Sequence, residues 1–241
     1  MVSFADNLEK FPHQAQVPMK DSSRSSESPD FEPMFKVSKD FSLPPYLMLL
    51  NLNRESIPAM NLLKRITSQD IDLTDQIVAL LADMNWRPHL IAAIAMALGS
   101  SSPKSVEKLW QTFDSGSWVS PQLAAVASIT DKDFSNNAKK RIENSCPINS
   151  ERLDSTDWLT RHTAAGPESV DGHSSKALAA LVALCGQEEE FTQWFEALAN
   201  RETIQQAIKK DDSDSGRIAI QWLQQLDSLV KLMESSSDTE G

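Results

Sequence analysis

The sequence predicts an all-α fold of stacked antiparallel helical hairpins, either α-solenoid-like or an irregular helical bundle, with an extended N-terminal arm. Its 241 residues include only 7 glycines, whereas alanine, leucine and glutamine are common, and these residues lose little freedom in a helix. Apolar residues recur at helical spacing in several segments, and we find no alternating run bounded by turn residues that indicates a strand. A chain of this length buries a core without disulfides.

Residues 1–42 are interpreted as an irregular arm. Prolines interrupt any long helix there, and the polar stretch "DSSRSSESPD" favours solvation. Phenylalanines are nevertheless spaced along the arm, which favours an extended strap that docks its aromatic rings on the helical body. Plain disorder before residue 30 is the alternative. The phenylalanines are Phe4, Phe11, Phe31, Phe35 and Phe41.

Helical patterns begin at Pro44. The segment "PPYLMLLNLNRE" predicts a short apolar helix, and "SIPAMNLLKRIT" predicts a second one with Ser56 as its cap and Pro58 in its first turn. A third helix is predicted over "DLTDQIVALLADM". Its apolar stripe consists of Ile77, Leu80, Leu81 and Met84.

The next segment, "NWRPHLIAAIAMALG" (85–99), predicts a buried central helix. Pro88 fits its first turn, with Asn85 or Arg87 near the cap, and Gly99 suits the left-handed position that ends a helix. The residues between these marks are apolar on nearly all sides, which indicates a helix covered by several neighbours. We interpret Trp86 as a lid, with the arginine and the histidine at the rim.

The same pattern recurs further along the chain. Ser102–Pro103 and Ser120–Pro121 each predict a helix start, and an [IL]-A-A-[IVL] quartet appears three times. Paired alanines between larger aliphatic residues make a narrow helix face, which lets a neighbouring helix approach closely. The quartets are 91–94, 123–126 and 178–181, and Trp86 and Trp118 hold equivalent places in the first two copies.

These units, each a small-faced helix beside an aromatic one, resemble the hairpins of HEAT-like and armadillo-like repeat proteins over residues 72–145 and 174–233. Gly186 is expected to end the third copy as Gly99 ends the first. The resemblance concerns architecture, and it implies a scaffold for protein partners.

The chain divides into an arm (1–42), a helical subdomain (43–145), a turn-rich connector (146–173) and an acidic helical segment (174–241) that packs on the same body. The connector is either a linker or an ordered surface loop. A long amphipathic helix closes the chain. Its stripe consists of Ile218, Trp222, Leu226, Leu229 and Met233.

The net charge of −11 disfavours binding to nucleic acids and anionic membranes, because a negative field repels both. Residues 186–241 hold 12 acidic and 5 basic residues, so most of the charge lies there. The longest apolar run, 90–98, is too short to span a membrane. With two widely spaced cysteines and no secretion signal at the start, we expect a cytoplasmic protein.

No motif for a reaction, a cofactor or a metal ion occurs in the sequence. The basic stretch at Lys139, Lys140 and Arg141 is interpreted as a solvated helix face. An enzyme or small-ligand binder with a pocket between helices is the competing hypothesis. Its candidate groups are Cys146, His162, Asp171, His173 and Cys185.

The preferred hypothesis is a non-enzymatic, cytosolic protein-binding protein. Its sharpest version is an acidic inhibitor of the immunity or antitoxin type, acting on a basic toxin; the alternative is a general helical-repeat scaffold or adaptor. Trp158, which has acidic neighbours in the connector, is either an anchor for the partner or a plug over the core. The expected contact residues for a basic protein partner are Asp154, Asp157, Trp158, Glu188, Glu189, Glu190, Asp211, Asp212 and Asp214.

Overall fold

The computed structural model describes residues 29–69, 71–144, 175–211 and 214–237. This part of the chain is all-α, as the sequence predicts, and its one bridge between extended residues joins Ser38 to Phe41. None of its helices is long and apolar enough to cross a lipid bilayer.

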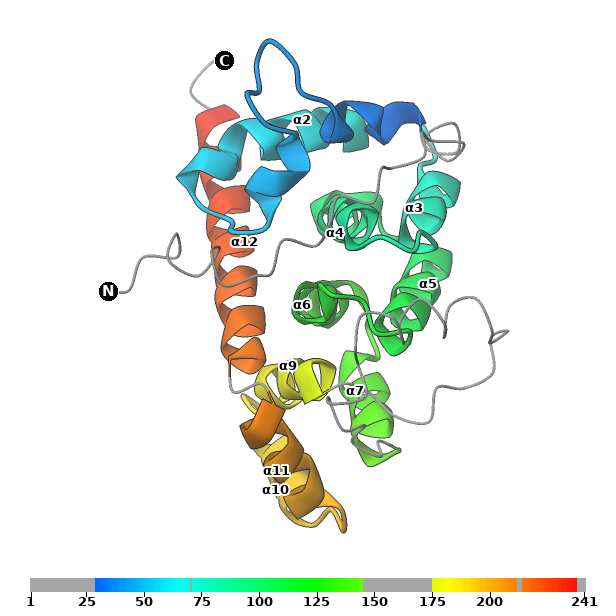
Figure 1. The fold of residues 1–241 in the computed structure, drawn as a ribbon, viewed down its shortest axis with the longest axis vertical. Helices are drawn as coiled ribbons and strands as arrows, with labels where there is room; N and C mark the ends of the chain where they lie inside the picture. Colours follow the sequence, from blue (N-terminus) through cyan, green and yellow to red (C-terminus); the bar gives the residue numbers. More distant parts are fainter. Residues whose placement is uncertain (1–28, 70, 145–174, 212–213, 238–241) are drawn as a thin grey trace.

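Two rows of helices form the body of the molecule (Figure 1). Each outer helix packs beside an inner one, and the chain alternates between the rows as it runs down the stack. The inner row consists of α4 (Trp86–Ala95), α6 (Ser120–Thr130) and α9 (Ser175–Cys185). The outer row consists of α3 (Thr74–Leu81), α5 (Pro103–Asp114) and α7 (Phe134–Glu143).

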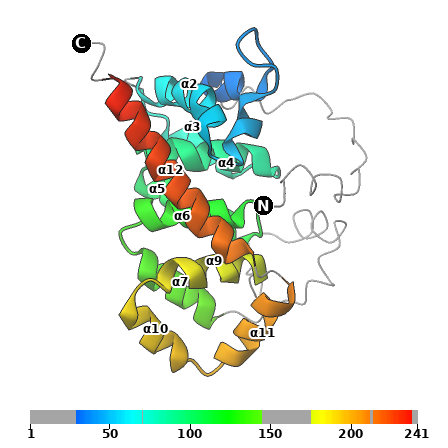
Figure 2. The ribbon, with the colours of Figure 1, turned by 90° about the vertical axis from the view of Figure 1, so that its left-hand side faces the viewer.

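The closing helix α12 (Ser215–Ser237) crosses the inner row on the side away from the outer helices, packing on α9 and α6 and ending beside α2 (Figure 2). The inner row therefore lies between two layers. The remaining helices cap the two ends of the stack. They are η2 (Pro29–Phe35), η3 (Pro45–Leu49), η4 (Arg54–Ser56) and α2 (Ile57–Thr67) at one end, and α10 (Glu189–Glu196) and α11 (Arg201–Asp211) at the other.

The three alanine quartets of the sequence are the centres of the three inner helices. Residues 91–94, 123–126 and 178–181 are all buried, as expected for narrow faces that let neighbouring helices approach closely. The prediction of alanine-lined seams between stacked helices is thus confirmed. The repeated quartet in the sequence therefore marks the three helices of the inner row.

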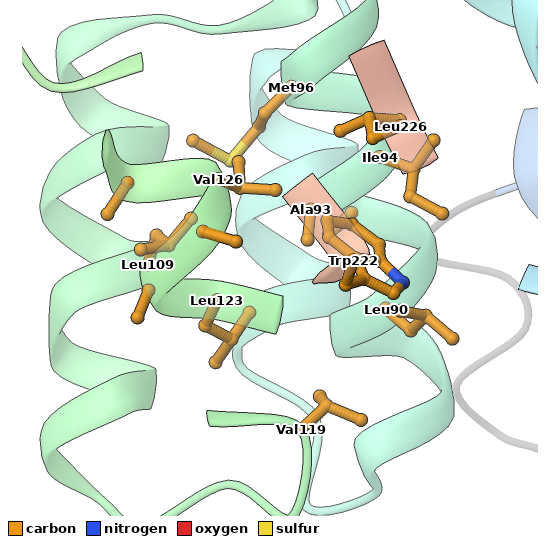
Figure 3. Packing of buried hydrophobic residues seen from close by; sticks show 14 of the residues in the cluster. Leu90, Ala93, Ile94, Met96, Leu109, Val119, Leu123, Val126, Trp222 and Leu226 are labelled. Carbon is orange, nitrogen blue, oxygen red and sulfur yellow. The ribbon is translucent and has the colours of Figure 1, made fainter. Parts of the chain in front are cut away.

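Helix α12 seals this row with one long apolar stripe. Figure 3 shows Trp222 and Leu226 among buried residues of α4 and α6. The Trp222 side chain is 2% exposed, and its indole N–H donates to the carbonyl oxygen of Leu49 at 3.3 Å. The predicted stripe is confirmed for its last four members. Ile218 is the exception: it is 36% exposed, and Ala219 is buried in that turn instead.

Several helix ends follow the predicted signals. The Asn85 side chain caps α4 by accepting from the Arg87 N–H at 3.2 Å, and Ser102 caps α5 in a capping box with Ser105. Gly99 has φ of 108°, the left-handed conformation that glycine adopts at low cost.

Other predicted ends are wrong in detail. Ser56 does not cap α2 with its side chain, because its hydroxyl donates to the Met48 carbonyl at 2.6 Å. Helix α6 begins at Ser120 itself, whose hydroxyl bonds the Ser117 carbonyl. Gly186 directly follows the last residue of α9, as predicted, but unlike Gly99 it has no positive φ, and a Cβ atom there would lie 2.8 Å from the Val182 carbonyl oxygen. Met84 lies beyond the end of α3 and is exposed.

The described part of the N-terminal arm docks on the body as predicted. Phe31 and Phe41 are buried, and Phe35 packs against the core. Residues 29–35 nevertheless form a 3₁₀-helix rather than an extended strap, which fits a short segment that contains two prolines. The segment "PPYLML" is likewise 3₁₀-helical. The arm's first 28 residues lie outside the described part.

Arg141 ties the outer helices α5 and α7 together. Its Nε and Nη2 donate to the two carboxylate oxygens of Asp114 at 2.7 and 2.8 Å, and its guanidinium lies 4.0 Å from the centre of the Trp110 ring. The interpretation of the basic stretch 139–141 as a solvated helix face is therefore wrong for Arg141. It is also wrong for Lys139, whose side chain is mostly covered. Lys140 is exposed.

Asp131 holds the adjoining turn between α6 and α7. Its carboxylate accepts from the Trp110 indole at 2.7 Å and from the Asn137 amide at 2.8 Å. Partial burial alone would raise the pKa of Asp131. These bonds, with one from the backbone N–H of Asp133 and the nearby Arg141 charge, outweigh burial and lower the pKa below 3.8.

The lowered pKa of Asp131 predicts a loss of stability in acid. The folded protein holds the ionised carboxylate more tightly than the unfolded chain does, so this contribution is present above about pH 4 and is lost as the pH falls through the folded pKa. We expect the unfolding free energy of Asp131→Asn to be lower at neutral pH and to fall less on acidification. Urea unfolding across this range measures both. Asp227→Asn, which removes a carboxylate from an exposed ion pair on α12, is the control.

Candidate partner-binding edge

Four aromatic side chains form a continuous row along the edge where the inner helices begin. We call Phe35, Tyr46, Trp86 and Trp118 the aromatic edge. Successive ring centres are 6.1, 6.1 and 5.0 Å apart. Lys176, in the first turn of α9, lies 4.8 Å from the Trp118 ring centre and extends the row to the third inner helix. Trp118 is the last aromatic residue of the row and is 50% exposed.

Arg87 fixes the middle of the aromatic edge. Its Nε donates to the Tyr46 hydroxyl at 2.9 Å, and its Nη1 donates to the Asn85 side-chain oxygen at 3.1 Å. Its guanidinium carbon is 5.0 Å from the Trp86 ring centre and 5.7 Å from that of Tyr46. The planar guanidinium is thus held on aromatic rings by two directed hydrogen bonds, which is an arrangement that lysine does not reproduce.

A buried histidine supports the turns beneath these rings. Nδ1 of His89 lies 2.8 Å from the Ser117 hydroxyl, and Nε2 lies 2.7 Å from the carbonyl oxygen of Asp83. Because a carbonyl only accepts, Nε2 donates to Asp83, and in the neutral ring Nδ1 then accepts from the Ser117 hydroxyl. His89 therefore joins the turn before α4 to the turn before α6, and so fixes Trp86 and Trp118 relative to one another.

The predicted acidic residues at the start of α10 are exposed, and each also has a partner in the molecule. Glu190 forms an ion pair with Lys139 of α7 at 3.1 Å. Glu188 accepts from the Ser135 hydroxyl at 3.4 Å, and Glu189 accepts from the Gln193 amide at 3.3 Å. These carboxylates also lie at the N-terminus of a helix, where negative charge is favoured.

Of the other predicted contact residues, Asp214 is the one whose side chain the structure describes. Asp214 is exposed before α12 and forms an ion pair with Arg217 at 3.2 Å. Asp211 is the last residue of α11, and its side chain is not described. The connector residues Asp154, Asp157 and Trp158, and also Asp212, lie outside the described residues.

Of the candidate reactive groups, only Cys185 is described. Burial raises the pKa of its thiol to about 12, and the Glu188 carboxylate adds to the rise. The thiol is therefore protonated at neutral pH and is a poor nucleophile. Cys146, His162, Asp171 and His173 lie outside the described residues. Within the described ranges, no three His, Cys, Asp or Glu side chains are grouped to hold a metal ion.

A shallow apolar groove of about 590 Å³ lies between α9, α11 and α12. Ala179, Val182 and Ala183 form one wall, and Ile208 and Ile220 contribute to the others. Among the described residues, Arg217 is its one charged lining residue, and Cys185 does not line it. The groove is therefore not lined by the one candidate reactive group that the structure describes.

Sequence reasoning missed the aromatic edge as a surface. It matched Trp86 with Trp118, and their rings do lie in contact, but it did not single out Trp118 as an exposed residue. Phe35 and Tyr46 come from two 3₁₀-helices remote in the sequence, and no periodicity links them to α4. One signal was visible: Arg87 stands in the first turn of a helix, where positive charge is disfavoured.

Comparison with known proteins assigns the chain to no family. No protein-family model matches it, and neither does any curated protein or solved structure.

Proposed function

We propose that this protein is a non-enzymatic, protein-binding scaffold of the helical-repeat type, which holds a partner against the aromatic edge. Its outer helices pack beside inner ones, α3 with α4, α5 with α6 and α7 with α9, an arrangement in keeping with HEAT-like or armadillo-like units. In such proteins each unit contacts its neighbours, and the stack offers an extended surface to a partner.

The half-exposed indole of Trp118 is the observation that carries the proposal. Tryptophan, tyrosine and arginine are the residues most enriched at binding hot spots, and all three types meet at this edge. Covering the exposed half of an indole, on the order of 100 Å², favours association by about 2–3 kcal/mol. The buried inner row keeps the platform rigid, so little ordering cost opposes binding.

A photo-crosslinking amino acid placed at residue 118 tests the proposal in the cells that produce the protein. We expect adducts of discrete mass that contain one or a few partner proteins. The matched control is residue 129 at the opposite end of α6, because Ile129 is 52% exposed and lies away from the aromatic edge. Absence of protein adducts at 118, or the same adducts at both positions, would contradict the proposal.

The acidic start of α10 favours a second candidate, an inhibitor of the immunity type that binds a basic toxin. Glu188 and Glu189 are exposed there, and residues 186–241 hold 12 acidic and 5 basic residues, a charge that attracts a basic partner. A crosslinker at residue 189 distinguishes the two candidates. Adducts with a basic protein at 189 and none at 118 would favour this second function.

A further inference from the structure

Arg87 is a partly buried arginine with which no carboxylate of the described residues forms an ion pair. Within the described residues, the other two partly buried arginines each pair with one: Arg141 with Asp114, and Arg201 with Glu196. The hydrogen bonds of Arg87 go to a phenol and an amide, which are neutral, and no described carboxylate lies within 4.0 Å of it. Among the described residues, the charge of Arg87 is therefore held in place by neutral groups and forms no ion pair.

The position of Arg87 adds to this positive charge. It lies in the first turn of α4, where the helix dipole is also positive. The carboxylate of Asp83 in the preceding turn accepts from the backbone N–H of Asn85 at 2.8 Å and makes no ion pair with Arg87. An anion beside the guanidinium is thus favoured by both the side chain and the helix terminus.

The aromatic edge also limits what kind of anion fits. The half-exposed Trp118 ring contacts the Trp86 ring on which Arg87 lies, so a ligand that reaches both Trp118 and Arg87 presents an apolar group to the first and an anion to the second. A polyanion such as a nucleic acid meets the repulsion of a protein with a net charge of −11. A peptide segment with a carboxylate beside an apolar side chain is attracted by the Arg87 charge, and the net negative charge of the protein repels it far less than it repels a polyanion.

We infer that the partner binds the aromatic edge through an acidic segment, with an Asp or Glu carboxylate on the Arg87 guanidinium and an adjacent apolar side chain against Trp118. This inference rests on the proposed function and names the chemistry of the partner. It also distinguishes this surface from the acidic start of α10, which suits a basic partner.

Selection from a library of short random peptides on the full-length protein tests the inference. We expect the enriched peptides to share an Asp or Glu next to a large apolar residue. Enrichment of basic or neutral peptides instead would overturn the inference while leaving the scaffold proposal standing. If no peptide is enriched, or if the enriched peptides bind Trp118→Ala as well as the native protein, the docking surface itself is wrong.

Direct binding of one enriched, synthesised peptide then isolates the role of the guanidinium. We expect Arg87→Gln to weaken binding about tenfold or more, and Arg87→Lys to restore only part of it, because lysine keeps the charge without the planar fork. Arg65→Gln, which removes an exposed arginine on α2, is the matched control and should bind normally.

Two further measurements make a negative result interpretable. Unfolding midpoints show whether Arg87→Gln retains the native fold, and Arg87→Lys serves as the less disruptive variant if it does not. A single-stranded oligonucleotide is the competing probe. Binding of that oligonucleotide as tightly as the peptide, or unchanged peptide binding by both Arg87 variants, would overturn the inference.

Discussion

Replacing Trp222 with alanine is expected to lower the free energy of unfolding by about 3–5 kcal/mol, the range for removing a large aromatic side chain from a core. The indole is 2% exposed and lies in the cluster that joins α12 to the inner row (Figure 3). Its loss also leaves the Leu49 carbonyl without the indole N–H as a donor. Both effects weaken the attachment of the closing helix to the rest of the molecule.

Urea unfolding followed by circular dichroism measures this loss. Leu232→Ala is the matched control, because it removes an aliphatic side chain from the same helix at a position that is 43% exposed. We expect the control to change the unfolding free energy by less than about 1 kcal/mol. Equal losses in the two variants would mean that α12 does not pack on the body through the stripe that contains Trp222.

Gly216→Ala is expected to destabilise the protein by about 1–3 kcal/mol, the usual cost of forcing an extra group into a packed site. A Cβ atom at Gly216 would lie 2.8 Å from the Ala183 Cβ and 2.9 Å from the Ala179 carbonyl oxygen. Neither neighbour is a flexible side chain that can swing away. The sign is diagnostic, because the same change inside an ordinary helix stabilises it by roughly 0.5–1 kcal/mol.

A double-mutant cycle with Ala183→Gly tests the cause of this destabilisation. Removing the Ala183 methyl group relieves one of the two close contacts, so the double variant should be more stable than the sum of the single changes predicts. Gln225→Ala, at an exposed position on α12, controls for the general effect of alanine. Strict additivity in the cycle would show that α9 and α12 do not meet at this point.

The sequence was most informative where local chemistry determines local structure. The alanine quartets identified the inner row because a helix covered on several sides needs small residues at its contacts. Asn85, Ser102 and Gly99 marked helix ends because capping depends on side chains within a few residues of the terminus.

The sequence was less informative where a residue's role depends on distant partners. Ser56 is predicted to cap α2, but its hydroxyl donates to the carbonyl of Met48 instead. Arg141 resembles a solvated cation, but Asp114 and Trp110 of another helix enclose it.

The candidate surface was harder to predict than the fold. The acidic residues of α10 stand out in the sequence because they are adjacent, and their exposure was foreseen. The aromatic edge is assembled from four elements, and only its Trp86–Trp118 contact follows from the repeat. That no described carboxylate pairs with Arg87 depends on its three-dimensional neighbours, which no local sequence pattern contains.

Native-state hydrogen exchange, resolved by residue, tests most directly whether the alanine-lined helices form the protected centre of the molecule. The amides of 91–94, 123–126 and 178–181 are buried between two layers, so we expect them to exchange slowest and together, at a rate set by global unfolding. Rapid exchange in any one quartet, with slow exchange in α12 or the outer helices, would contradict a stack built on that inner row.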